Sequence, residues 1–358
     1  MIRIEDGWSD AEPWDAFVQA HPQSRYCQLF GYGRVVACYG YRPRYLAFLR
    51  NRDLVGVLPV AEVSSVLYRR RLVSQPFSEY GGMLLDPGLP EGEVRAALDV
   101  LREYLRRDSR ASSLELHGNH GMGPTPEGQP MRAEAVGHIA FMELTADTDT
   151  LWRDVVRYSV RKAVKQAQNY GVTVSFDCDQ AILERDFFPL YLKSMKRLGV
   201  PPHKFAYYGR SLVEFGPRMM LAMARAADGT PIAGLLGFAC GARVNIINTV
   251  SDPDHWNLKA NDLLHWEAIK RTAEAGHRLF DFGSVRYEGQ STYKKKWGTV
   301  LADHHNFLLA STERRGNRQV VINSSSDSMK KMSRLWSAYM PDRIGQHLGP
   351  MIRGQLAR

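Results

Sequence analysis

Two periods of apolar residues run along this chain, one typical of strands and one typical of helices. Short apolar runs bounded by turn residues predict strands at residues 45–50, 54–63, 113–116, 219–225, 232–240, 244–250, 279–282 and 300–309. Apolar residues spaced three and four apart predict helices at residues 13–20, 90–107, 151–170, 187–197, 262–275 and 329–339. Strands and helices mixed in this order predict an α/β (α+β) fold.

The order of the predicted elements occurs twice. Residues 45–63 (YLAFLRNRDLVGVLPVAEV) resemble residues 220–240 (MLAMARAADGTPIAGLLGFAC), and residues 98–118 (LDVLREYLRRDSRASSLELHG) resemble residues 263–283 (LLHWEAIKRTAEAGHRLFDFG). Each half therefore runs hairpin, strand, helix, strand, which is the sign of an internal repeat. We expect a first domain at 1–145, a second at 146–312, and a basic linker and helical tail at 313–358.

Composition and charge narrow the class of protein. The 358 residues suffice for about two domains with real cores. The net charge of +9 and pI of about 9.4 favour polyanionic partners such as tRNA, a sugar nucleotide or an anionic membrane surface, without choosing among them. The four cysteines form no CxxC pair, and the first residues do not form a signal peptide, so we expect a cytoplasmic protein.

The predicted helix at 151–170 carries one line of positive charge. Arg153, Arg157, Arg161 and Lys165 repeat every four residues beside a broad apolar face, and Asp154 is the single acid among them. Like charges at this spacing repel each other, so a phosphate-bearing ligand such as tRNA is one interpretation. A solvated basic face is the other.

Residues 280–298 (FDFGSVRYEGQSTYKKKWG) combine a strand end with a cation cluster. An apolar run ends at Asp281 and Gly283, and a polar loop leads to Tyr293 and to the lysines Lys294, Lys295 and Lys296. Loops at the end of a buried strand often carry chemistry, so this stretch predicts a site. The alternative is a solvated basic hairpin.

The first half offers weaker candidates. Glu79 and Tyr80, in the turn cluster SEYGG, could face a cleft or serve the turn alone. His117 and His120 have the spacing of a metal pair, but no third ligand is visible, so we expect loop histidines and no metal.

Two further patterns in the first half carry no function. QLFGYG at 28–33 matches a pyrophosphate-binding pattern but precedes the first hairpin, so we treat it as a chance match. Ser112 and Ser113 lack the context of a nucleophile elbow, which argues against a serine hydrolase.

Five segments carry a family resemblance: VGVLPV, LVSQPFSEYGGMLL, YSVRKAVKQAQNYGV, KANDLLHWEAIKRTAEAGHRLFDFG and YKKKWG. With their order, the chain resembles the Fem-type branch of the N-acetyltransferase (GNAT) superfold, which includes the aminoacyl-tRNA-dependent peptidoglycan aminoacyltransferases. The resemblance covers about residues 14–310. It is nearest to the Fem-related proteins of exopolysaccharide and exosortase systems, which carry a tail like residues 336–356. It implies two tandem GNAT-like domains, each a mixed, mostly antiparallel sheet flanked by helices.

The resemblance also implies residue roles. In the peptidoglycan enzymes an aromatic–lysine pair before the final strand places the lysine near the transferred aminoacyl group. Tyr293 and Lys294 match this pair, with tyrosine in place of the usual phenylalanine. Lys294 would then stabilise the oxyanion or the tRNA 3′ end, as a fixed cation in a dry site can. The attacking amine must lose a proton, for which Glu79, Asp281 or the substrate itself are the candidates.

A departure from the CoA-dependent relatives bears on the donor. Those relatives open the helix after the central strands with a glycine-rich pyrophosphate cradle, whereas residues 258–263 (LKANDL) contain no glycine. This disfavours acyl-CoA and favours aminoacyl-tRNA. Lys259 and Asn261 at this position, with Arg286, Lys295 and Lys296 further on, are the expected substrate or tRNA contacts.

We therefore expect an enzyme without a cofactor that moves an aminoacyl group from tRNA to an amine of a peptide, nucleotide-sugar or lipid-linked cell-envelope precursor. One alternative is an acyl-CoA-dependent N-acyltransferase acting on an exopolysaccharide amino sugar. Another is a tRNA- or glycan-binding module without catalysis. The amphipathic segment at 329–339 either docks on the protein or lies in the inner face of the membrane.

Overall fold

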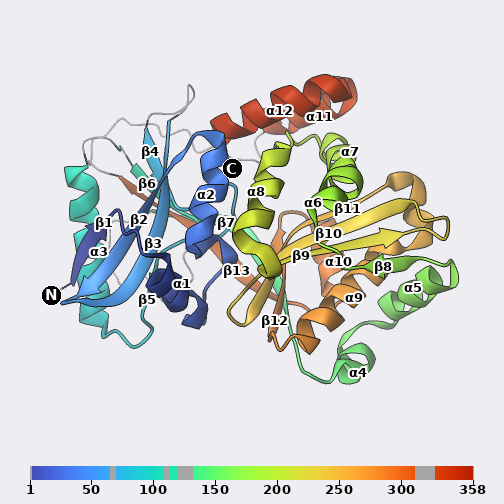
Figure 1. Cartoon of the computed structure of the whole chain (residues 1–358), viewed down its shortest axis with the longest axis horizontal. Helices are drawn as coiled ribbons and strands as arrows, with labels where there is room; N and C mark the ends of the chain where they lie inside the picture. The colour runs from blue at the N-terminus through green and yellow to red at the C-terminus, as the bar shows by residue number, and fades with distance from the viewer. Residues whose placement is uncertain are drawn as a thin grey trace. The chain divides into compact units, whose positions relative to one another are not determined.

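The computed structural model describes residues 2–64, 70–108, 111, 113–118, 132–310 and 327–357. The chain forms two compact units (Figure 1). Unit 1 comprises Met1–Gly137, Asp303–Val321 and Gly354–Arg358, and unit 2 comprises His138–Ala302 and Ile322–Arg353. None of the described helices is long and apolar enough to cross a membrane.

Unit 1 is a mixed sheet with three α-helices. Its strands are β1 (Ile2–Asp6), β2 (Arg42–Arg50), β3 (Asp53–Val63), β4 (Arg71–Val73), β5 (Leu84–Leu85), β6 (Ser113–Leu116) and most of β13 (Val300–Ala310). They lie in the order β1-β2-β3-β4-β6-β13, with β5 beside β3, and only the β4–β6 pair is parallel. The helices are α1 (Ala11–Ala20), α2 (Phe30–Val36) and α3 (Glu91–Arg107). Leucines 98, 101 and 105 of α3 complete the core.

Unit 2 has the same kind of sheet. Its strands are β7 (Arg132–Glu143), β8 (Thr173–Ser175), β9 (Met219–Arg225), β10 (Pro231–Cys240), β11 (Arg243–Ser251) and β12 (Leu279–Val285). They lie in the order β7-β12-β11-β10-β9-β8, and only the β11–β12 pair is parallel. Its helices are α4 (Thr148–Thr150), α5 (Tyr158–Asn169), α6 (Gln180–Ile182), α7 (Phe188–Leu198), α8 (Phe205–Phe215), α9 (Ala260–Glu274), α10 (Glu288–Lys295), α11 (Asp327–Tyr339) and most of α12 (Asp342–Leu356).

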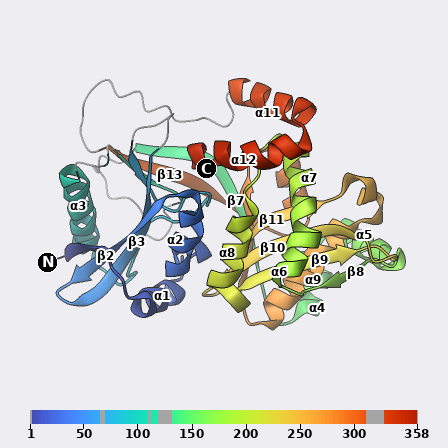
Figure 2. The same ribbon diagram turned by 45° about the horizontal axis from the view of Figure 1, so that its top comes forward.

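Helices cover both faces of the sheet in unit 2 (Figure 2). On one face, α5 and α9 bury Val164 and Leu264 with Leu235 of β10 in one core. On the other face, Phe215 of α8 packs on Phe238 of β10 with ring centroids 4.6 Å apart. Both faces of the central strands are therefore buried, which explains their long apolar runs.

The predicted repeat is confirmed. In unit 1 the β2–β3 hairpin is followed by β4, α3 and β6, and in unit 2 the β9–β10 hairpin is followed by β11, α9 and β12. In both units the helix connects two neighbouring parallel strands, as a parallel pair requires a long crossover. The predicted fold class, mixed α/β with mostly antiparallel sheets flanked by helices, is also confirmed.

In each unit, the strand at one end of the sheet order comes from the other half of the sequence. The strand predicted at 300–309 lies inside the expected domain 146–312, yet its residues 303–310 belong to unit 1, where they pair with β6. The β7 strand had no predicted counterpart, and its residues 138–143 pair with β12 in unit 2. The expected domain limits followed sequence order, whereas β13 and β7 each pair with a strand from the other half of the chain.

Two predicted elements need correction. The single helix expected at 151–170 is a π-helical turn at Leu151–Val155 followed by α5, because Val156 is extended with ψ 125°. The amide of Arg157 donates to the carbonyl of Lys296 at 3.0 Å, so a tertiary contact replaces a helical hydrogen bond. The polar loop expected between Gly283 and Lys294 contains α10.

Candidate active site in unit 2

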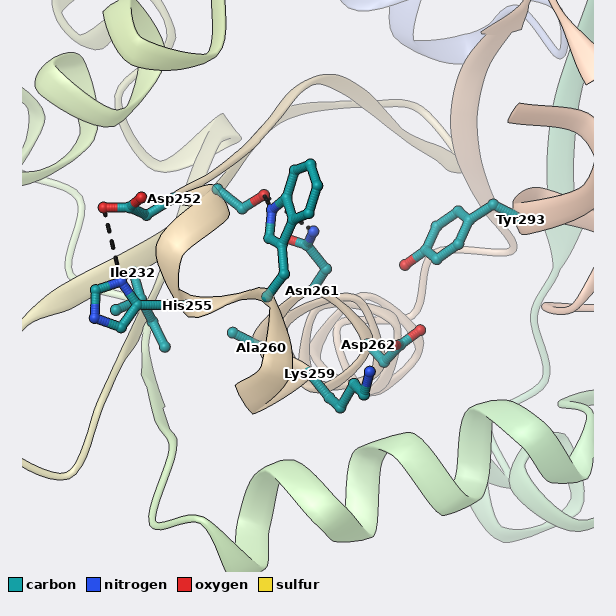
Figure 3. Close-up of a pocket in the computed structure, with 10 residues that line it drawn as sticks. Ile232, Asp252, His255, Lys259, Ala260, Asn261, Asp262 and Tyr293 are labelled. Carbon is teal, nitrogen blue, oxygen red and sulfur yellow. Dashed lines mark hydrogen bonds and ion pairs between the residues drawn. The ribbon is translucent and has the colours of Figure 1, made fainter. Parts of the chain in front are cut away.

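A cavity of about 200 Å³ lies where β11 ends and α9 begins (Figure 3). The chain passes from β11 through a 3₁₀ turn at Pro253–Leu258 and enters α9 at Ala260. The lining side chains come from these segments, from β10 and from α10: Ile232, Ser251, Asp252, His255, Trp256, Lys259, Ala260, Asn261, Asp262 and Tyr293. Three predicted substrate contacts or catalytic residues, Lys259, Asn261 and Tyr293, thus meet at one cavity.

Local backbone chemistry creates this opening. The carboxylate of Asp252 accepts the amide of Asp254 at 3.1 Å and starts the 3₁₀ turn. Lys259 then adopts a left-handed conformation with φ 57°, which turns the chain into α9. No side chain caps the first turn of α9, so the positive end of the helix faces the cavity uncovered.

Asp262 is the acidic side chain at this helix start. Burial raises the pKa of its carboxyl, while the charges of Lys296 and Lys259 and a hydrogen bond with Tyr293 oppose that rise. Burial also raises the pKa of the Tyr293 phenol well above its ordinary value. Tyr293 therefore remains a hydrogen-bond donor, and Asp262 is a carboxylate of increased basicity that can accept a proton.

His265 contacts Tyr293 and lies outside the cavity lining. Its Nδ1 lies 2.8 Å from the carbonyl of Asn261 and 3.3 Å from the Tyr293 hydroxyl. Because a carbonyl can only accept, Nδ1 carries the proton, and Nε2 can accept from the Thr249 hydroxyl at 3.4 Å. Burial lowers the pKa of His265 to about 4, so its ring is neutral. It positions Tyr293 without adding charge.

Aromatic rings pack around His265. His265 stacks on Phe282 with ring centroids 5.5 Å apart, and Trp297 packs against both. Trp297 is fully buried. Tyr293 lies against the rings of His265 and Trp297, with ring centroids 5.7 and 6.5 Å apart, and its hydroxyl points toward the cavity (Figure 3).

Lys294, the central residue of the predicted site, binds the backbone. Its ammonium donates to the carbonyls of Phe282, Gly283 and Ser284 at 2.7, 3.0 and 2.6 Å. These carbonyls lie at a bulge in β12, where Gly283 has φ 74°. Lys294 therefore holds the strand end in shape, and its direct role at an oxyanion stays a prediction.

Asp281 is fully buried and surrounded by donors. Its carboxylate accepts from Arg243 at 3.1 Å, from Asn245 at 3.0 Å and from the amide of Gly283 at 2.8 Å. These contacts give the carboxylate a structural role, and its predicted role as a proton acceptor gains no support from them.

The helix expected to carry the basic ribbon is interrupted before α5, which separates Arg153 from the basic residues of α5. Their role in tRNA binding stays a prediction. Arg161 donates to the carbonyls of Trp152, Arg153 and Val156 at 3.0, 2.7 and 2.7 Å and thereby closes the interrupted turn. The Arg153 side chain pairs with Asp154 at 3.1 Å. Exposed basic side chains remain at Arg157, Lys165, Arg286 and Lys295.

The first-half candidates belong to unit 1. Glu79 is half-buried, and Tyr80 is buried between the guanidinium of Arg25 and the ring of His304. The ring of His117 is buried and contacts Glu115 and the carbonyl of Ser78. His120, Ser112 and the glycine-rich loop after Gly118 fall outside the described residues.

The remaining patterns of the first half are structural in the described part of the chain. Gln28, from QLFGYG, is buried and donates to the carbonyl of Gly82. No group of three potential metal ligands occurs among the described residues.

Asp262 was missed as a candidate from the sequence, as were Asp252, His255 and Trp256. Asp262 stands three residues after Lys259, in the first turn of a predicted helix. An acid there usually stabilises the helix end, so the pattern alone does not separate a catalytic carboxylate from an ordinary one. The signal that would have marked it is its contact with Tyr293, which is distant in sequence.

Comparisons with known proteins bear on the fold of unit 2. Residues 155–295 match the model of an acetyltransferase (GNAT) domain, and this segment includes Asp262 and Tyr293. A comparison with curated protein sequences found no match.

Solved structures share the fold at low sequence identity. A structure of FemX aligns with a TM-score of 0.67 at 15% identity, over 86% of this chain and 97% of that chain. L-PGS from Bacillus licheniformis aligns with 0.53 at 14% identity, over 92% and 98%. A tandem GNAT protein from the clavulanic acid biosynthesis pathway aligns with 0.52 at 14% identity, over 87% and 100%. The chain therefore has a GNAT-type acyltransferase fold with Fem-like structural neighbours.

Proposed function

We propose that this chain is an N-acyltransferase that forms an amide bond at the cavity of unit 2, with aminoacyl-tRNA as the donor. The observation that carries the proposal is Asp262, a carboxylate of raised pKa that lines the cavity beside Tyr293. Amide formation needs such a group, because the attacking amine must lose a proton as the new bond forms.

The proposed reaction assigns roles to Asp262 and Tyr293 of the cavity lining. The nitrogen of the acceptor amine attacks the ester carbonyl carbon of the donor, and Asp262 takes the proton from that nitrogen. The C–N bond forms, the C–O ester bond breaks, and the released ribose oxygen of tRNA takes up the proton from Asp262. Tyr293, held by His265, donates a hydrogen bond that orients the Asp262 carboxylate. The products are the amide and uncharged tRNA.

The chemistry of the helix start supports this donor. A pyrophosphate placed on the first turn of α9 would meet Cβ atoms, since residues 259–264 contain no glycine, and the Asp262 carboxylate would repel it. Lys259 and Lys296 supply two positive charges near Asp262, which suits the single phosphate beside an aminoacyl ester.

A second donor has one observation in its favour. The first turn of α9 has no side-chain cap, and an uncapped helix start attracts phosphate groups. An acyl-CoA donor acting on an exopolysaccharide amino sugar is therefore the alternative. For either donor, the acceptor amine would belong to a peptide, a nucleotide-sugar or a lipid-linked precursor of the cell envelope.

The donor is tested by supplying both kinds in parallel. The purified chain is incubated with cell-envelope precursors and a charged tRNA pool, or with acyl-CoA, and the products are identified by mass spectrometry. We expect a mass gain of one aminoacyl residue that disappears after RNase treatment. A gain that survives RNase and requires acyl-CoA would select the alternative donor. Salt-sensitive tRNA or glycan binding without product would favour a module that has lost catalysis.

The role of the cavity is tested by Asp262→Asn. Loss of a general base lowers the turnover rate by roughly 10²–10³-fold, and we expect that loss with an unchanged melting temperature. Asp254→Asn is the matched control, because Asp254 is exposed in the adjacent 3₁₀ turn and lies outside the cavity lining. Near-normal turnover of the Asp262 variant would remove this carboxylate from the mechanism.

A further inference from the structure

The two C-terminal helices, α11 and α12, expose a group of apolar side chains. Among the described residues, fifteen large hydrophobic side chains are exposed, and seven of them lie on α11 and α12: Met332, Leu335, Tyr339, Ile344, Leu348, Met351 and Ile352. Tyr339 and Met351 are 78% and 68% exposed. Such a concentration on two short helices marks an interaction surface rather than scattered surface residues.

The inner faces of these helices are fixed on unit 2. The hydroxyls of Ser333 and Ser337 each donate at 3.2 Å to carbonyls at the end of α7. Gly349 of α12 packs so closely on Pro202 that a Cβ there would lie 2.3 Å from the proline ring. Trp336 is only 9% exposed. The apolar set is therefore the outward face of two docked helices, which lie together at the edge of unit 2 in both views (Figures 1 and 2).

Positive charge borders this apolar face. Lys331, Arg334 and Arg343 are exposed on the same helices. The acid Asp342 is neutralised by Lys196 of α7 at 2.6 Å. A surface of apolar side chains bordered by cations complements a partner with an apolar interior and a negatively charged boundary.

We propose that α11 and α12 bind in the plane of an anionic phospholipid bilayer, with the seven apolar side chains inserted among the lipids. The helices have 13 and 15 residues, and a helix needs roughly 20 apolar residues to span the hydrocarbon core, so they lie along the surface. The three cations contact the lipid phosphates. This contact would hold unit 2 at a membrane surface, whichever donor the cavity uses.

The test is sedimentation of the full chain with lipid vesicles. Vesicles of phosphatidylcholine mixed with phosphatidylglycerol are compared with vesicles of phosphatidylcholine alone. We expect binding to the mixed vesicles that weakens as salt is raised. Leu335→Ser and Met351→Ser should each weaken it about tenfold, because each removes a large apolar side chain from the lipid. Neutralising Lys331, Arg334 and Arg343 to Gln should weaken it about fivefold per charge.

Val213→Ser is the matched control, because Val213 is 71% exposed on α8, outside this surface. It should bind as the unchanged chain does. Circular dichroism and the melting temperature check that each variant is folded, and the charge variant keeps the test valid if a serine variant unfolds. Equal binding to neutral vesicles would overturn the anionic requirement. Absent vesicle binding, with a dimer in solution that Met351→Ser dissociates, would show that a second copy of the chain covers this face.

Discussion

The strands β6 and β12 occupy equivalent places in the two units, but the carbonyl groups at their ends accept hydrogen bonds from different partners. In unit 1, backbone amides of the loop after β4 cover the strand end: Ser74 donates to the carbonyl of Glu115, and Gly82 donates to that of His117, both at 2.8 Å. In unit 2, a single side chain, Lys294, donates hydrogen bonds to three consecutive carbonyls of β12. The same requirement to satisfy buried carbonyls is met once by a loop and once by a lysine.

The segment that leads into the crossover helix also differs between the two units. In unit 1 the chain runs from the end of β4 at Val73 through the covering loop and begins α3 only at Glu91. In unit 2 it runs from the end of β11 at Ser251 through the short 3₁₀ turn at Pro253–Leu258 into α9 at Ala260. The described cavity lies at this helix start, and Lys294 reaches β12 from α10. The two halves of the repeated framework thus differ in the segment that precedes the crossover helix.

The repeat also preserves an ion pair. Arg71 and Arg243 are the first residues of β4 and β11, and each binds an acid on the neighbouring parallel strand, Glu115 at 2.7 Å and Asp281 at 3.1 Å. The acids occupy matching registers, opposite Val73 and Asn245. Equivalent pairs in different surroundings allow a direct comparison of the two units.

The largest expected effect is the loss of unfolding free energy when one of these two ion pairs is broken. Asp281→Ala leaves Arg243 buried without its carboxylate, and breaking such a pair costs about 3–5 kcal/mol of unfolding free energy. Glu115→Ala should cost less, about 1–3 kcal/mol, because the Arg71 side chain is 12% exposed and reaches more water. Urea unfolding measures both. Equal losses would show that the two pairs are equivalent in energy as well as in place.

The sequence could predict the framework because the framework rests on local patterns. Apolar runs and their repetition located the hairpins, both crossover helices and the strand of Asp281. The pattern could not show that Arg157 bonds Lys296 and breaks the predicted helix, since the contact joins residues distant in sequence. The site was found only in part for the same reason: Tyr293 and Lys259 were expected, whereas Asp262 gains its basicity from burial that only the fold creates.

A second difference between the units lies on their crossover helices. His265 has no counterpart on α3, where the repeat places Val100. Burial lowers the pKa of His265 from 6.5 to about 4, so the unfolded chain binds this proton first as the pH falls. Its contribution to stability is present above pH 6.5 and is lost between 6.5 and about 4, by about 3 kcal/mol.

His265→Gln should remove that part of the acid sensitivity. The measurement is the free energy of unfolding of both proteins from pH 7 to pH 4, where the difference between them should shrink as the pH falls. Parallel curves would mean that His265 binds its proton equally well in the folded and unfolded chain.

The next prediction concerns Lys294, which donates hydrogen bonds to the carbonyls at the end of β12. Lys294→Met removes the donor for three carbonyls, and a lowered unfolding free energy of about 1–3 kcal/mol would follow from leaving them unsatisfied. The role carried over from the peptidoglycan enzymes predicts instead a complete loss of product with an unchanged fold. Measuring turnover and the melting temperature of the same variant separates the two. Near-normal turnover would leave Lys294 with a structural role alone.

The smallest effect concerns the interrupted helix before α5. Arg161→Met should lower the unfolding free energy by about 1–2 kcal/mol, since three carbonyls of the broken turn lose their donor. Arg153→Met is the control, because its exposed pair with Asp154 contributes only about 0–1 kcal/mol. If both arginines instead serve as a ribbon for tRNA, the two variants should weaken tRNA binding equally and leave stability unchanged. A stability loss confined to Arg161→Met would assign this arginine to the fold.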